Sequence, residues 1–122
     1  MPTPDLQGGV EGLVVRVAGV RRYIPLASVI EVLREARIIR APGAVPAVLG
    51  MVNHRGRVLT VADARRALDL AGDATTGREV VVVHWQQHRF GVAVDAVVEL
   101  TGEARTGLAE IDLDRIAAAI FA

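Results

Sequence analysis

A run of four valines, Val80 to Val83, is the feature that most constrains the fold of this chain. So continuous an apolar run is typical of a strand that is covered on both faces. After a short polar turn, apolar side chains alternate from Phe90 to Leu100, which predicts one continuous strand with Asp95 on the face opposite Phe90. Hydrophobic residues make up 52% of the sequence and aromatic residues only 3%, and Val and Ala supply most of the apolar side chains. Because β-branched side chains fit a pleated sheet, we predict a mainly β fold.

The remaining segments predict short strands, two helices and two irregular regions in a chain whose 122 residues suit one domain. Residues 1–12 are expected to form a flexible leader, residues 13–122 a single domain, and residues 72–78 a linker inside that domain. Gly56 marks the turn of a hairpin over residues 51–61, because glycine adopts positive φ without strain. Further strands are expected at 13–17, 22–25 and 29–33, and helices are expected after the capping residues Asp63 and Asp112.

Charge and residue usage exclude several classes of function. The chain has 14 basic and 14 acidic residues, a net charge of zero, and every basic residue is arginine. The absence of lysine excludes Schiff-base chemistry and a phosphate-binding lysine, and the absence of cysteine excludes thiolate catalysis and thiolate metal sites. Zero net charge argues against nucleic acid and an anionic membrane as partners. No apolar run approaches the ~20 residues of a membrane span and no signal peptide is recognised, so we expect a cytoplasmic protein without membrane insertion.

The residues that could support catalysis or metal binding are few and scattered. His84 and His88 are four residues apart, but they are expected across a strand end and a turn, where they would not share a face. A small hydrolase that uses one of these histidines with Asp95, or with Ser28 as a nucleophile, stays as an alternative that nothing in the sequence assembles. The acidic residues before the last helix are better explained as helix caps than as an acid/base pair. We therefore expect no enzyme activity, no catalytic residues, no metal and no cofactor.

The predicted strand segment 29–33 is apolar except for one carboxylate, Glu31, which lies between Ile30 and Val32. Burying a carboxylate without a partner is costly, and Arg55, which projects from the turn beside Gly56, is the natural partner because a guanidinium binds a carboxylate bidentately. The alternative is that Glu31 points to water from an edge strand. Composition and spacing leave both interpretations open.

Several short motifs, in a fixed order, carry a resemblance to a known family. They are Val29-Ile30-Glu31-Val32, Pro42 with Pro46, Gly50-Met51-Val52-Asn53-His54-Arg55-Gly56, Leu59-x-Val61-x-Asp63 and Gly91-Val92-Ala93-Val94-Asp95-Ala96-Val97. Over residues 13–100 the chain resembles the CheW family, the adaptor proteins that couple chemoreceptors to the CheA-type histidine kinase. The resemblance implies a cytoplasmic protein in chemoreceptor clusters. It also implies two small SH3-like β-barrels, the first over about residues 17–72 and a shortened second over about 13–16 plus 79–122, with short helices and a C-terminal amphipathic helix.

The resemblance also implies two binding surfaces. In the family, the cytoplasmic tip of a methyl-accepting receptor docks in a groove between the barrels, and a Glu31–Arg55 ion pair would join the two segments that line it. The implied receptor-binding residues are Val29, Glu31, Val32, Gly50, Asn53, Arg55 and Gly56. The second barrel carries the main surface for the kinase, and the residues implied to face the kinase are Gly91, Asp95 and Val97.

The chain departs from the family after Leu100. The family continues with further strands, whereas here the polar residues 101–107 lead directly to Leu108 and the last helix. At least one strand pair of the second barrel is therefore expected to be absent, as in a truncated member of the family. This favours an adaptor that binds receptors and modulates receptor arrays with weak or absent binding of the kinase. The alternative is a full coupling protein that bridges receptor and kinase. Besides the receptor and the kinase, other CheW-like proteins are candidate partners.

Overall fold

The computed structural model of this chain describes residues 11–40, 43–72, 79–101 and 107–121. The predicted leader (1–12), the predicted linker (72–78) and most of the segment 101–107 lie almost wholly outside these residues. The described elements are β1 (Gly12–Val17), β2 (Val20–Pro25), the short 3-10 helix η2 (Leu26–Ser28), β3 (Val29–Leu33), β4 (Val48–His54), β5 (Arg57–Asp63), α1 (Ala64–Ala67), β6 (Glu79–Trp85), β7 (His88–Val94), β8 (Ala96–Thr101), β9 (Ala109–Glu110) and α2 (Leu113–Ile120). The prediction of a mainly β protein with few helices is confirmed.

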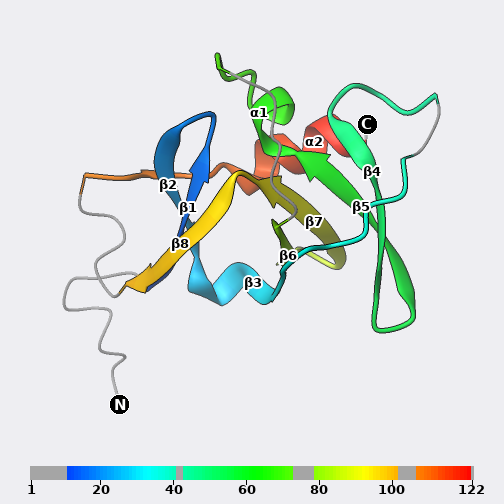
Figure 1. The fold of residues 1–122 in the computed structure, drawn as a ribbon, viewed down its shortest axis with the longest axis horizontal. Coiled ribbons are helices and arrows are strands. Elements are labelled where there is room, and N and C mark those ends of the chain that lie inside the picture. Colours follow the sequence, from blue (N-terminus) through cyan, green and yellow to red (C-terminus); the bar gives the residue numbers. More distant parts are fainter. Residues whose placement is uncertain (1–10, 41–42, 73–78, 102–106, 122) are drawn as a thin grey trace.

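The strands form two sheets that pack together (Figure 1). The larger sheet has the order β3-β6-β7-β5-β4 and the smaller one the order β8-β1-β2-β9. Within the described residues the two sheets are not closed barrels, although the fold is consistent with the SH3-like type. The larger sheet joins β3, β4 and β5, which precede residue 72, to β6 and β7, which follow residue 78, so the sheets do not divide at the expected linker.

Strand β6 is buried on both faces, as its run of four valines predicts. All four valines, Val80 to Val83, are 0% exposed. Val81 and Val83 face the main core, which lies between the two sheets and is closed by the helices α1 and α2. Val80 and Val82 face a second core on the other side of the larger sheet, against which Leu33, Ala36 and Ile38 pack. A strand with cores on both faces has no polar side, which explains the uninterrupted run.

The prediction of a single strand from Phe90 to Leu100 is wrong. Strand β7 ends at Val94 in the larger sheet, and β8 begins at Ala96 in the smaller sheet. Asp95 lies between them, where its backbone N–H donates to the carbonyl oxygen of Arg16 at 2.9 Å and its Oδ2 accepts from the Gly19 N–H at 3.2 Å. These long-range bonds set the change of sheet, and the local alternation of apolar residues does not reveal them.

The turn and the helix caps that the sequence predicts are confirmed. Arg55 and Gly56 both have positive φ, 52° and 82°, as the two-residue turn between β4 and β5 requires. The Asp63 side chain accepts from the N–H groups of Arg65 and Arg66 at the start of α1, and Asp112 accepts from the Arg115 N–H at the start of α2. Neither helix in the described part of the chain is long and apolar enough to cross a bilayer.

Candidate partner-binding groove

Strand β3 brings the apolar segment with Glu31 to one edge of the larger sheet. It pairs with β6 alone, and its register shifts between Val29 and Glu31, so that Ile30 lies on the outside of a bulge and is exposed. Bulges of this kind redirect the side chains that follow them. Glu31 is thereby presented at the surface toward the β4–β5 hairpin, which extends away from the two helices in Figure 1.

Two residues of the β4–β5 hairpin meet the same oxygen of Glu31. The Nε atom of Arg55 donates to Oε1 of Glu31 at 3.2 Å, which confirms the predicted ion pair. The Nε2 atom of His54 lies 2.8 Å from the same Oε1. The hydrogen bond from His54, and then that from Arg55, hold the pKa of the Glu31 carboxyl below its ordinary value of 4.5, because both stabilise the charged form.

The sequence-based hypothesis missed His54, although the sequence carries a signal for it. Gly50, Val52 and His54 are alternate residues of β4, and all three are buried. A histidine two residues beyond an inward-facing valine in a strand is expected to point inward as well. His54 therefore continues the inward face of β4 and reaches Glu31 from inside the molecule.

A groove of about 450 Å³ lies beside this contact. Its apolar lining consists of Val32, Leu33, Ala36, Ile39 and Val52, and its polar lining consists of Glu31, Arg34, Arg37 and Asn53. Arg34 forms an ion pair with Glu79 on β6, whereas Arg37 is exposed and no such pair engages it among the described residues. The groove thus has an apolar floor and a cationic rim, a combination typical of a site for a partly apolar, acidic partner.

The other residues implied to bind a receptor fall into two groups. Val32 lines the groove, whereas Val29 packs against the main core and is not among the lining residues. Asn53 also lines the groove, whereas Gly50 and Gly56 are not among its lining residues. A Cβ at Gly50 would lie 2.4 Å from the carbonyl oxygen of Ile39, so the close approach that this glycine permits is to the chain's own backbone. Asn53 Oδ1 accepts from the Gly56 N–H at 3.1 Å and holds the turn that carries Arg55.

The three residues implied to face a kinase lie close together along the chain but differ in burial. Gly91 is buried in the middle of the larger sheet, where a Cβ would lie 2.6 Å from Val80 Cγ1, so it presents no surface to a partner. Asp95 joins the two sheets. Val97 is half-buried against the main core, and its N–H donates to Glu79 at 2.7 Å. The structure does not bring these three residues together into one surface patch.

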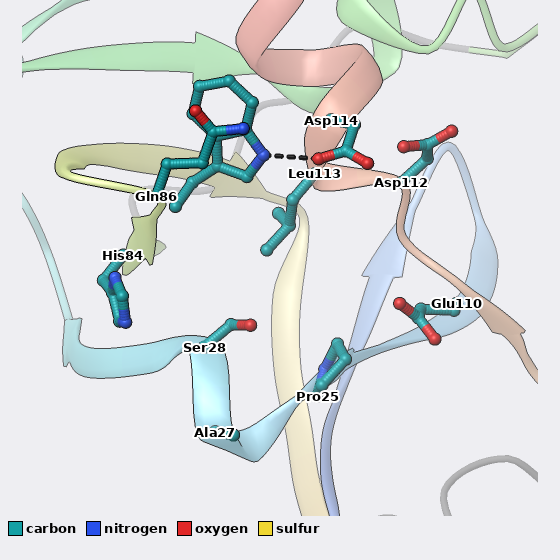
Figure 2. A pocket seen from close by; sticks show the side chains of 10 residues that line it. Pro25, Ala27, Ser28, His84, Gln86, Glu110, Asp112, Leu113 and Asp114 are labelled. Atoms are coloured by element: carbon teal, nitrogen blue, oxygen red, sulfur yellow. Dashed lines mark hydrogen bonds between the residues drawn. The ribbon is translucent and has the colours of Figure 1, made fainter.

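A second cleft, of about 650 Å³, lies between η2, the β6–β7 turn and the start of α2 (Figure 2). Its carboxylates are bonded within the chain: Glu110 accepts from the Tyr23 hydroxyl, Asp112 caps α2, and Asp114 accepts from the Trp85 indole N–H. Ser28 and His84 also line this cleft, but Asp95 does not. Among the described residues, no group of three or more His, Cys, Asp or Glu could hold a metal ion.

Comparison with known proteins identifies the family of this chain. A sequence model of the CheW-like domain matches residues 11–106, which is most of the chain. The chain belongs to the CheW-like domain family. Members of this family are non-enzymatic scaffold proteins of chemotaxis, and they generally interact with chemoreceptors and with CheA.

A solved structure supports the same fold. The crystal structure of the scaffolding protein TtCheW from Thermoanaerobacter tengcongensis matches with a TM-score of 0.71, and the match covers 80% of this chain and 68% of that one. The two sequences are 20% identical, so the likeness concerns the fold alone. A comparison with curated proteins finds no match. The resemblance to the CheW family is confirmed by the family match and by the shared fold.

Proposed function

We propose that this protein is a chemosensory adaptor whose groove binds the cytoplasmic tip of a methyl-accepting chemoreceptor and so modulates receptor array assembly or signalling. The observation that carries the proposal is the groove itself, with its apolar floor, its arginine rim and the lining residue Glu31, to which His54 and Arg55 bond. Its lining includes Glu31, Val32 and Asn53, which are among the residues that the family resemblance implies for receptor binding. The proposal places the protein in the cytoplasm, in chemoreceptor clusters.

The proposal includes weak or absent binding of the CheA-type kinase. Between β8 and α2 the described residues contain only the two-residue strand β9, which pairs with β2. Gly91, Asp95 and Val97, the residues implied to face the kinase, share no surface patch. In this respect the chain resembles FrzB, the truncated coupling protein of the Frz chemosensory system. A full coupling protein, which binds receptor and kinase alike, is the alternative.

A binding experiment with matched charge reversals tests the proposal. The ligand is a purified fragment containing the cytoplasmic tip of a chemoreceptor from the same organism, called here the receptor fragment. We expect Arg55→Glu to weaken its binding by more than about tenfold, because an acidic side chain would then repel an acidic partner at the groove. We expect Arg89→Glu, near the start of β7, to change it by less than about twofold. Thermal melts of both variants separate lost binding from lost stability.

The same titration with the regulatory domain of the kinase distinguishes the two functions. Binding of the receptor fragment with much weaker or no binding of the kinase domain supports the proposed adaptor. Comparable affinities for both ligands support the full coupling protein. Failure of the unmodified protein to bind the receptor fragment, or equal effects of the two charge reversals, contradicts the assignment of the groove.

A further inference from the structure

The two groups that bond to Glu31 differ in how firmly the fold holds them. His54 is 2% exposed and lies on the inner face of β4, so its ring is fixed by the surrounding core. The Arg55 side chain is 75% exposed and projects from the tip of the hairpin. The shorter of the two contacts is the one to His54, at 2.8 Å against 3.2 Å for Arg55. A buried and rigid donor positions an acceptor better than a long, solvated side chain does, because less rotamer entropy is lost.

The environment of the His54 ring favours one tautomer. Its Nε2 atom lies at hydrogen-bond distance from the Glu31 carboxylate, whereas its Nδ1 atom is buried and has no partner among the described residues. With a single proton on Nε2, the ring donates to Glu31 and leaves only a lone pair at Nδ1. The other tautomer, with the proton on Nδ1, would bury an N–H without an acceptor, which costs more than leaving a lone pair unused. The ring therefore donates to Glu31 through Nε2 from a fixed position.

Arg55 retains most of its hydrogen-bonding capacity. Among the described residues it bonds to Glu31 through Nε, and its two terminal nitrogens form no hydrogen bond that the structure records. A guanidinium presents its donors as a planar fork, and a carboxylate can bind the free side of that fork with two parallel hydrogen bonds. Because His54 bonds to Glu31 from inside, Arg55 can turn toward a partner without leaving the Glu31 carboxylate unpaired.

We propose that His54 is the positioning residue for Glu31, and that Arg55 is thereby released to bind a carboxylate on the partner that occupies the groove. The second part rests on the proposed function. The partner that fits is an amphipathic helix whose apolar side chains cover the groove floor and which carries an Asp or Glu that faces Arg55. Arg37, at the groove rim, adds a second cation for an acidic side chain of the same helix. The groove accordingly selects for negative charge next to an apolar anchor.

Nuclear magnetic resonance of the free protein tests the positioning role without any partner. The carboxyl carbon of Glu31 is followed through an acid titration in the unmodified protein and in His54→Leu, His54→Gln and Arg55→Ala. We expect His54→Leu to raise the Glu31 pKa more than Arg55→Ala does, and the amide donor of His54→Gln to restore part of the shift. The nitrogen shifts of His54 should report a proton on Nε2. An Arg55→Ala effect equal to or larger than that of His54→Leu, or a proton on Nδ1, overturns the positioning role.

Binding of the receptor fragment tests the role of Arg55. We expect Arg55→Ala to weaken binding about tenfold with little change in melting temperature, while Arg57→Ala, an equally charged neighbour on the same hairpin, changes binding less than twofold. Exchanging the facing acidic residue of the receptor fragment for arginine should restore binding to Arg55→Glu. Equal losses for Arg55→Ala and Arg57→Ala overturn the assigned contact. Failure of the unmodified protein to bind overturns the proposed function, while the titration result for His54 stands by itself.

Discussion

The groove beside Glu31 and the cleft at the start of α2 differ in how their charged groups are used. The cleft is larger, about 650 Å³ against about 450 Å³. Its three carboxylates accept hydrogen bonds from Tyr23, from the backbone of α2 and from Trp85, so they serve the structure of the protein. In the groove Arg37, and beside it most of the Arg55 guanidinium, are not engaged by the described residues. The cleft is therefore the larger of the two sites, but the groove is the one whose charged groups remain available to a partner.

The largest effect is expected where the groove depends on close backbone contact. In Gly50→Ala the new Cβ would meet the Ile39 carbonyl oxygen at 2.4 Å, and backbone atoms cannot move aside easily. We expect a loss of about 2–3 kcal/mol in the free energy of unfolding, measured by urea denaturation, because overpacking of this kind displaces a segment of the chain. The control is Gly19→Ala, at a turn with φ of 79° and no atom within 4 Å, which should cost about 1 kcal/mol of backbone strain. Equal losses would mean that the contact between Gly50 and Ile39 does not form.

Charge reversals on either side compare the groove and the cleft directly. Arg37→Glu places a negative charge on the groove rim, and Glu110→Arg places a positive charge at the cleft, so both variants change the net charge by two units. We expect Arg37→Glu to weaken binding of the receptor fragment about tenfold, or about 1.4 kcal/mol, and Glu110→Arg to change it less than twofold. Isothermal titration calorimetry gives both affinities. A larger effect of Glu110→Arg would assign the partner to the cleft.

The cleft should respond in stability rather than in binding. Asp112→Ala removes the side chain that accepts from the Arg115 N–H at the start of α2, which should lower the free energy of unfolding by about 1 kcal/mol. Asp112→Asn retains an acceptor at this position and should restore most of the loss. Urea denaturation measures both variants, and the affinity for the receptor fragment should stay unchanged. A loss of affinity in Asp112→Ala that Asp112→Asn does not restore would contradict a purely structural role for this carboxylate.

The smallest effect is expected in the pH dependence of stability. The lowered pKa of Glu31 means that its ionised form is favoured in the folded protein. Its contribution to stability is present above the unfolded value near 4.5 and is lost as the pH falls through the lower folded value. We therefore expect Glu31→Gln to lower the free energy of unfolding at pH 7 and to have little effect at pH 3, measured by urea denaturation at both. An equal effect at both pH values would mean that the charge of Glu31 contributes nothing.

Local signals predicted the elements that depend on few neighbours. The turn at Arg55 and Gly56, the caps at Asp63 and Asp112 and the doubly buried β6 follow from residue chemistry within a few positions along the chain. The Glu31–Arg55 pair came from a resemblance, since composition and spacing left it open. The contribution of His54 was not predicted, because the family motif implies a role for Arg55 and none for His54. The alternation of buried residues along β4 nevertheless places His54 on the inward face.

The errors share a different cause, which is long-range pairing. The sheet change at Asp95 depends on bonds to Arg16 and Gly19, nearly eighty positions earlier in the chain, and alternation within 90–100 contains no trace of them. Gly91 was implied to lie at a surface by resemblance, but its place in the middle strand of a sheet follows only from the strand order. Strand order is a property of the assembled fold, so a pattern read along one segment does not determine it.

The pairing of β1 with β8 also affects how the chain folds during its synthesis. Gly12 of β1 is the register partner of Thr101 of β8, which lies 89 residues later in the chain. Strand β2 follows β1 immediately and can pair with one of its edges as soon as it leaves the ribosome. At roughly 5–20 residues per second, the other edge waits on the order of 4–18 seconds for β8 to be synthesised. During that interval β1, an apolar strand, has one unpaired edge. We expect a chaperone that binds nascent chains at the ribosome to shield this edge and so to raise the yield of folded protein.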